Sequence, residues 1–537
     1  MACRSALIRE VRSKCPSISR WVEFCYPKPA RLYYNDYTLT SSQGVKQGDT
    51  MEVSKALQMI RTDGPSSGLC LNIYKTDVFW TTMDPRSSMD GVFPRGIGRP
   101  SDGVKLLGRP VSLSTQFCSD MVLARVELME CIKRLQDPQC ELLLVRNCAG
   151  VSKLYFTMRT TNPQALRAAK SRLDQYLQLF LWYLITGDGA GYGLLQHRIA
   201  TLPIKDGGLG VYIMEDTTQY CYVASYFRTQ HLQSTILGNN TNSDVSPHYQ
   251  HALENYMNVC NLSPSTFSIN DAAPQPMHFL AVRFFEAIKR EIPNTFHMSE
   301  RDSILWQSNR LANAQDYLKA IPIAGLNHAI GPRQFRSVLQ YRYGIPLFEE
   351  DSTCACCNRI MDSFGDHALH CASDIGLSFR YNLVRDFCEE MCYKANVAAR
   401  KEAAVGFLSS KDNVMRPVDI LIYNWECGRD VCFDVTGVSP FAGSGYRNFT
   451  LGHAISAAIT RKRNKYVDKC STHGYDFSVL AFSSLGELGE RLKKCMDAHD
   501  ANNNLGSSLF YRLGIIIQKG VGAQLVARLP TLPTSSV

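Results

Sequence analysis

The sequence predicts an α+β protein built from several domains. Its 537 residues suffice for roughly three or four domains of about 150 residues each. Apolar residues make up 45% and charged residues 20%, a composition typical of a folded chain. Apolar residues recur at helical spacing through the middle of the chain, whereas short strand-like runs occur near both ends.

Charge and the cysteine content indicate the class of partner and the compartment. The net charge of +9 is a mild bias towards polyanions such as nucleic acid. No apolar run reaches the ~18–20 residues of a membrane span, and the opening MACRSALIREVRSK lacks the apolar core of a signal peptide. The 20 cysteines are therefore expected to be mostly reduced thiols. We expect a nuclear or cytoplasmic protein that is neither secreted nor in a membrane.

Composition divides the chain into six consecutive segments. Glycine spacing in LPIKDGGLGVY does not fit a phosphate-binding loop, so no small-molecule cofactor is expected in any of them. Residues 1–115 have short strands and turns, 116–231 are strongly helical, and 232–345 begin with an Asn- and Ser-rich loop or linker, to 275, before further helices. Residues 346–375 are rich in cysteine and histidine, and 376–500 have an α/β pattern. Residues 501–537 form an apolar helical tail that is expected to pack back on an earlier domain.

A basic start precedes the apolar stripe of the helix predicted in SRLDQYLQLFLWYL. The basic residues are Arg167, Lys170 and Arg172. One interpretation is a core-facing helix whose first turn is solvated. The other is a basic helix that follows a nucleic-acid phosphate backbone.

The stretch CACCNRIMDSFGDHALHC has metal-ligand spacing. Two residues separate Cys354 from Cys357 in a tight turn, and His367 and Cys371 lie one helical turn apart. Such a set can complete the tetrahedral shell of Zn²⁺, and zinc would supply folding energy that so small a module lacks. Buried thiols beside a surface histidine are the alternative. Two further candidate ligands are Cys356 and His370.

Two aspartates lie in neighbouring strand-like runs of RPVDILIYNWECGRDVCFDV. If the hairpin is centred between Glu426 and Cys427, Asp419 and Asp434 are directly opposite each other. Cross-strand partners have Cβ atoms about 4.5–5.5 Å apart, so the two carboxylates repel unless a proton or a cation lies between them. Mg²⁺ fits, because it prefers oxygen ligands and keeps water molecules for chemistry. The alternative is a pair of solvated strand residues.

Further catalytic candidates flank this pair. The helix predicted in AISAAITRKRNKYVDKC offers Lys462 and Lys465, one turn apart, either of which would orient or polarise an attacking water. Glu402, in the preceding strand-like run, is a candidate third acid. The segment RKRNK is alternatively an import signal or an exposed basic face. Its arginines, Arg461 and Arg463, are candidate contacts to nucleic acid.

Taken together, these motifs resemble the C-terminal part of a LINE-type retrotransposon polyprotein of the plant-genome kind. CPSISRWVEFCYPKPARL with SSQGVKQGD, LCLNIYKTDVFW and GVKLLG resemble parts of a reverse-transcriptase fingers and palm, and LPIKDGGLGVY resembles a region after its thumb. CACC…GDHALHC resembles the family's Cys-Cys-His-Cys zinc knuckle. RPVDILI…CFDVTGVSP, followed by the KRNKY helix, is similar to its restriction-enzyme-like PD-(D/E)xK endonuclease.

The resemblance implies a domain for each segment. In chain order these are a truncated fingers and palm remnant, a helical thumb-like region, a linker with helices, a zinc knuckle, an α/β nuclease and a helical tail. It also implies that Asp419 and Asp434 hold Mg²⁺ and that Lys462 or Lys465 assists. A lysine usually stands two residues after the second acid in such nucleases, and here that position is Thr436.

The palm departs further from the family pattern. A polymerase needs carboxylates for two metal ions, and the sequence has no YxDD-like turn. Asp49 stands alone in a glycine turn and is no substitute. We therefore expect no RNA-directed DNA polymerase activity. The hypotheses are a Mg²⁺-dependent DNA-nicking enzyme, with DNA as its target and an RNA template as a further partner, a non-catalytic nucleic-acid-binding module, or an inert relic.

Overall fold

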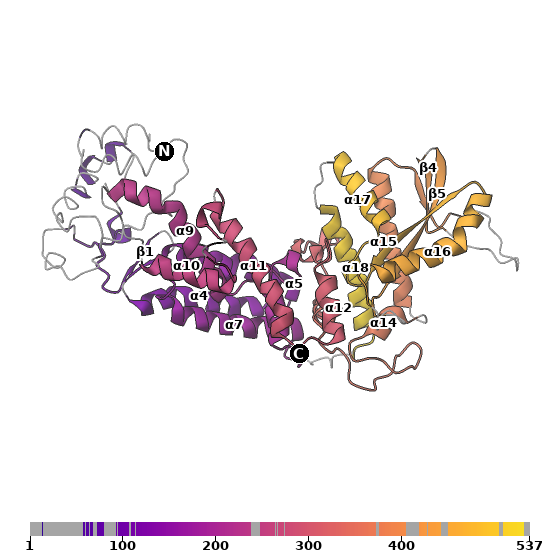
Figure 1. Cartoon of the computed structure of the whole chain (residues 1–537), viewed down its shortest axis with the longest axis horizontal. Coiled ribbons are helices and arrows are strands. Elements are labelled where there is room, and N and C mark those ends of the chain that lie inside the picture. The colour runs from indigo at the N-terminus through magenta and orange to yellow at the C-terminus, as the bar shows by residue number, and fades with distance from the viewer. Residues whose placement is uncertain are drawn as a thin grey trace. The chain divides into compact units, whose positions relative to one another are not determined.

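The computed structural model of the chain is a mixture of helices and two small sheets, consistent with the predicted α+β class (Figure 1). The chain divides into two compact units: unit 1 comprises 1–128, 149–176 and 213–288, and unit 2 comprises 129–148, 177–212 and 289–537. The structure describes 114–237, 247–371 and 375–530, with gaps at 264, 266, 273, 404–417, 427, 442–448 and 504–507, and, before residue 114, short stretches of which 72–79 and 95–106 are the longest.

Unit 1 is mainly helical. Helix α9 packs against α6 and α10, and the rings of Tyr226 and Tyr249 stack with centroids 4.3 Å apart. The carboxylate of Asp174 accepts hydrogen bonds from the first amides of α9, at Met214 and Glu215, and so caps a helix start that has no intrahelical partners. The helices are α4 (Thr115–Lys133), α6 (Tyr155–Thr160), α7 (Arg167–Thr186), α9 (Met214–Leu237), α10 (Pro247–Val259) and α11 (Pro276–Thr295), of which α4, α7 and α11 continue into unit 2.

The Asn- and Ser-rich stretch 232–275 is not all loop. It contains α10, whose Tyr249, Ala252 and Tyr256 are buried at helical spacing. The composition of the stretch is typical of a loop, but the apolar period within it favours a helix. The prediction of a loop there was wrong over these residues, because tertiary burial of one face outweighs the polar composition.

The predicted fingers and palm remnant falls largely outside the described residues, as does its glycine turn with Asp49. Within it, strands β1 (Val104–Leu106) and β2 (Arg109–Val111) form an antiparallel pair. The boundaries of the six predicted segments do not coincide with those of the two compact units. The division into those six domains therefore stays a prediction.

A four-stranded sheet organises the C-terminal part of unit 2. Its order is β3-β4-β5-β6, with β5 parallel to β6 and the other pairs antiparallel. The two runs predicted as a hairpin are β4 and β5, which confirms the pairing. The strands are β3 (Ala399–Lys401), β4 (Ile420–Glu426), β5 (Arg429–Val438) and β6 (Asp476–Ser483).

Helices cover both faces of this sheet (Figure 1). On one face, Leu421 and Cys432 pack with Tyr466 of α16 in a buried cluster. On the other face, the Tyr381 hydroxyl of α15 donates to the Gly437 carbonyl of β5 at 3.2 Å. The flanking helices are α15 (Ile375–Lys394), α16 (His453–Thr472), which was predicted from its periodicity, and α17 (Glu490–Asn503).

The C-terminal helix α18 (Ser508–Val526) packs against α13 and α15, so the tail does return to earlier elements as predicted. The buried face of α18 includes Leu513, Ile517 and Val521, which recur at helical spacing. Among the helices that the structure describes, none combines the length and hydropathy needed to cross a membrane. The other helices of unit 2 are α5 (Pro138–Leu144), α8 (Leu194–Ala200), α12 (Glu300–Asn309), α13 (Pro332–Arg342) and α14 (Asp366–His370).

Candidate functional site

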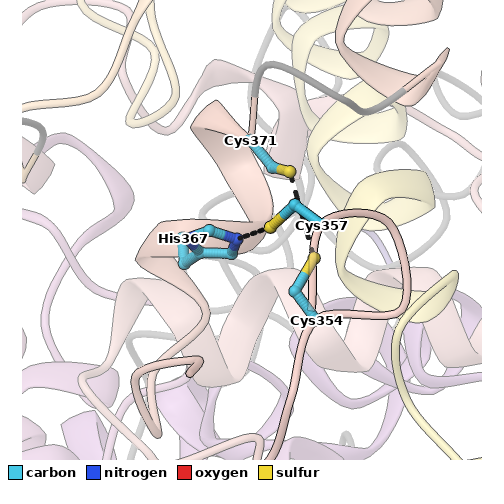
Figure 2. Close-up of side chains that lie close together, drawn as sticks. All are labelled: Cys354, Cys357, His367 and Cys371. Atoms are coloured by element: carbon cyan, nitrogen blue, oxygen red, sulfur yellow. Dashed lines mark hydrogen bonds between the residues drawn. The ribbon is translucent and has the colours of Figure 1, made fainter. Parts of the chain in front are cut away.

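The predicted metal ligands converge in one small module of unit 2. Figure 2 shows the side chains of Cys354, Cys357, His367 and Cys371 turned towards one another. Their ligand atoms all lie within 4.8 Å of each other. The predicted spare candidates are not part of this group. Within the described part of the chain, no other set of three or more histidine, cysteine or acidic side chains is arranged to share an ion.

The spacing of these atoms fits a tetrahedral metal shell. With Zn–S near 2.3 Å and Zn–N near 2.0 Å, the edges of a tetrahedron are about 3.8 Å for two sulfurs and about 3.5 Å for sulfur and nitrogen. The Sγ atoms of Cys354 and Cys371 are 3.9 Å apart, and Cys357 Sγ lies 3.2 Å from His367 Nε2. The cluster could therefore hold a metal ion such as zinc.

Local backbone structure explains how the module forms. The amide of Cys354 donates to the Arg359 carbonyl, and the Asn358 amide donates back to the Cys354 carbonyl, both at 2.8 Å. Asn358 closes this turn at φ 54°, in the left-handed region that asparagine tolerates better than most residues. The turn brings Cys357 back towards Cys354, as a two-residue spacing requires.

Asp362 fixes the second half of the module. Its carboxylate accepts hydrogen bonds from the amides of Phe364, Asp366 and His367, the last at 2.7 Å. These amides belong to the first turn of α14 and the loop before it, so Asp362 satisfies free N–H groups at a helix start whose N-cap residue, Gly365, has no side chain to do so. These hydrogen bonds hold the helix that carries His367, with Cys371 directly after it.

The environment of Cys354 favours its thiolate. Burial opposes ionisation, but hydrogen bonds from Arg528, from the amides of Cys356 and Cys357 and from His367 outweigh it and lower the pKa of Cys354 to about 5. A thiolate is the form of cysteine that binds metal. The donors around the sulfur thus prepare the site for a cation.

The two candidate acids of the sheet lie at one end of the β4–β5 pair. Ile420 pairs with Phe433, and the Asp419 amide donates to the Phe433 carbonyl at 2.9 Å. Continuing this register by one residue places Asp419 opposite Asp434, as predicted. The tip of the hairpin differs from the prediction, because a bulge between Ile422 and Glu426 shifts the pairing there.

Asp434 is buried and already has two side-chain partners. The Nζ of Lys462 lies 2.8 Å from its Oδ1, and the hydroxyl of Thr436 donates to its Oδ2. Asp434 is only 5% exposed, and the ammonium group compensates its charge. Lys462 reaches the strand from α16, so the amine and both acids lie on the sheet face that this helix covers.

Asp419 is less stable as an anion. Burial raises its pKa, and the nearby Asp434 carboxylate adds to this effect. Its Oδ2 accepts the Val435 amide at 2.6 Å, which lowers the pKa, as do the charges of Lys462 and Arg385. The net shift is upwards, so a cation beside Asp419 would relieve the cost of ionising it.

The side chains of the other predicted catalytic residues have other partners. Lys465 is exposed, with its Nζ 4.8 Å from the Tyr466 ring centroid, so of the two lysines only Lys462 contacts an acid of the pair. Glu402 donates its amide to the Asp419 carbonyl, but its φ of 48° turns the chain, and its carboxylate pairs with Arg385 of α15. The arginines at 461 and 463 are exposed on α16.

The basic residues at the start of α7 lie in unit 1. Arg167 and Arg172 are exposed, whereas Lys170 forms an ion pair with Glu215 at 2.5 Å. A cleft of about 480 Å³ opens beside them. Its polar lining includes Arg167, Lys170, His248 and His251. The stripe that follows in α7 is buried, which confirms the core-facing helix. At its start, Arg167 and Arg172 are exposed, whereas Lys170 is held by Glu215.

Comparison with known proteins adds no relative. No protein-family model matches the chain, and no curated protein matches it.

Sequence reasoning missed several residues around both sites. Asp362 had a signal, because an aspartate a few residues before a short helix is typical of an N-terminal cap. Strand alternation placed Thr436 on the same face as Asp434, but its hydrogen bond to that carboxylate was not predicted. Arg385 and Arg528 had no local signal, since each meets its partner through tertiary packing.

Proposed function

We propose that this chain is a retrotransposon-derived nucleic-acid protein with a structural Zn²⁺ module and a Mg²⁺-dependent DNA-nicking site. The observation that carries the nuclease is the Lys462 amine at 2.8 Å from Asp434, with Asp419 opposite on the neighbouring strand. Two carboxylates can hold a divalent ion that activates water and phosphate, and an amine beside them can contact the attacking water or a phosphate oxygen. The proposed setting is the nucleus or cytoplasm, with DNA as target and RNA as a further partner.

The chain's own groups have separate roles in this proposal. Asp419 and Asp434 would hold Mg²⁺, which when bound supplies Lewis-acid activation of the phosphate and a more acidic water. Lys462 contacts Asp434 Oδ1 at 2.8 Å and has further N–H donors for a phosphate oxygen or a water molecule. Thr436 fixes the second oxygen of Asp434, which limits rotation of that carboxylate.

Polymerase activity is not part of the proposal. The sequence lacks the YxDD-like turn, and no other motif in it supplies the paired palm carboxylates. The palm remnant is proposed to be inactive in nucleotide transfer.

The decisive experiment is nicking of supercoiled plasmid by the purified full-length chain with Mg²⁺. We expect conversion to the open-circular form, loss of conversion with Asp434→Ala, and a decrease of about 100-fold or more with Lys462→Ala. Lys465→Ala is the matched control, because its amine lies on the same helix but contacts no acid of the pair, and it should nick like the wild type.

A second candidate function is nucleic-acid binding without chemistry. The observation that favours it is that both oxygens of Asp434 already have protein partners, Lys462 and Thr436. An ion must then compete with, or share, these contacts. Binding of plasmid by the wild type without nicking, in Mg²⁺ and in Mn²⁺, would replace the nuclease by this alternative.

A further inference from the structure

The C-terminal end of the chain reaches the metal module. Arg528 lies just after α18, and its Nη2 is 3.5 Å from Cys356 Sγ. The same side chain hydrogen-bonds to Cys354, one of the four converging ligands. Its Nη1 donates to the Gln524 carbonyl at 2.9 Å, which anchors the guanidinium to the last turn of the helix. A residue distant in the sequence thus contacts the cysteine turn.

Close packing fixes the end of α18 against the module. Gly365 precedes α14 with a φ of 90°, in the left-handed region. A Cβ added there would lie 2.8 Å from Leu525 Cδ2 and 2.9 Å from Phe348 Cε2. A larger residue would therefore be strained by its positive φ and would force the Leu525 or Phe348 side chain to move. Leu525, three residues before Arg528, thus lies in contact distance of the start of α14.

The charge of the metal centre explains why a cation is needed. Three thiolates and a neutral histidine around Zn²⁺ carry a net charge of −1. Cys354 is fully buried and Cys371 is 3% exposed, so this charge lies partly outside solvent. An uncompensated charge in such a place is costly, and donors to the ligand sulfurs reduce the cost.

We propose that Arg528 is a positioning residue of the zinc centre, one that neutralises its net negative charge and holds the Cys354–Cys357 turn through N–H···S hydrogen bonds. Retention of zinc then depends on the C-terminal helix, although the four ligands lie within residues 354–371. The inference rests on the zinc part of the proposed function and is independent of the DNA-nicking part.

A simpler explanation is that Arg528 only caps α18. Arginine near a helix C-terminus is favourable through the last carbonyls alone, and the contact to Gln524 has this form. The two explanations differ in what happens at the sulfur atoms. A cap affects the stability of the helix, whereas a positioning residue changes the affinity for zinc and the reactivity of the thiolates.

The test compares Arg528→Gln and Arg528→Lys with Arg512→Gln in the full-length chain. Arg512, on the same helix, pairs with Glu390 of α15 at 2.8 and 3.0 Å and contacts no metal ligand. Zinc affinity is measured by competition with a chromogenic chelator. Thiolate reactivity is measured in the zinc-loaded protein by the rate of alkylation with iodoacetamide, and circular dichroism checks that each variant is folded.

We expect Arg528→Gln to weaken zinc binding about 10–100-fold and to speed alkylation. Arg528→Lys should be intermediate, because lysine keeps the charge but not the planar fork of donors. Arg512→Gln should leave zinc affinity within about twofold of the wild type even if it lowers the melting temperature. Wild-type affinity and alkylation in Arg528→Gln, or an equal loss in Arg512→Gln, would overturn the inference. A wild type that binds no zinc would overturn the zinc site itself, and the plasmid assay would still report on nicking.

Discussion

The cysteine–histidine module takes its four candidate ligands from residues 354–371, whereas the acid pair with Lys462 combines side chains from β4, β5 and α16. In the module, a tight turn and a capped one-turn helix place the ligands by short-range hydrogen bonds. In the acid site, the placement depends on strand register and on how α16 docks. The residues of a site formed by local backbone structure can be predicted from their spacing in the sequence. The residues of a site formed by three separate elements can be predicted only in part.

The largest expected effect is loss of the metal from the module. Cys357→Ala removes one of four ligands, so the chain should lose its one zinc ion and several kcal/mol of stability, because zinc binding contributes about 10–16 kcal/mol in isolated zinc-finger peptides. Metal content by mass spectrometry and a thermal melt measure this. Cys131→Ser is the control, since Cys131 is an exposed cysteine outside the ligand group, and this variant should retain zinc. If the wild type without metal were as stable as the zinc-loaded protein, the module would not be a structural zinc site.

The next largest expected effect is a loss of stability when Asp434 loses its contact with Lys462. Lys462→Met leaves the buried Asp434 with Thr436 as its remaining side-chain partner among those described, which should cost about 1–3 kcal/mol at neutral pH. Lys465→Met removes an exposed amine from the same helix and should change stability by about 0.5 kcal/mol or less. Urea unfolding of both variants gives the difference. Equal costs would show that Asp434 does not need this amine.

A smaller effect is expected from the cap of the module. Asp362→Ala removes the acceptor of three amides at the start of α14 and should cost about 1–2 kcal/mol, with weaker zinc binding. Glu350→Ala changes an exposed acid nearby and should be close to neutral. Chelator competition and urea unfolding measure the two consequences. A neutral Asp362→Ala would mean that metal binding alone fixes the helix.

The smallest expected effect is a gain in stability. Burial and the neighbouring Asp434 raise the pKa of Asp419 above its value in the unfolded chain, so the native state binds the proton more tightly. Stability therefore falls as pH rises from the unfolded pKa of about 3.9 through the folded pKa. Asp419→Asn should remove this pH dependence and raise stability at neutral pH, by less than about 1 kcal/mol. Melting curves across pH 4–8 without divalent ions test the sign, and a destabilised variant would contradict it.

The sequence made the elements of both sites predictable, because their signals are short-range. Spacing identified the four ligands of the module, alternation identified β4 and β5, and helical periodicity identified α16 and α18. The register that opposes Asp419 and Asp434 followed from counting along a hairpin. It held next to the acids but not at the tip, because the bulge after Ile422 has no clear sequence signature.

Only the tertiary structure decided which candidates share a site. Lys462 and Lys465 lie one turn apart on the same helix, and the docking of α16 on the sheet brings one of them to Asp434 and leaves the other in solvent. Glu402 donates its amide to the Asp419 carbonyl, yet its carboxylate is paired with the guanidinium of Arg385. Arg528 meets the cysteine turn only because α18 packs beside α14. Spacing fixes contacts within one turn or hairpin, whereas contacts between distant elements depend on packing that no local pattern encodes.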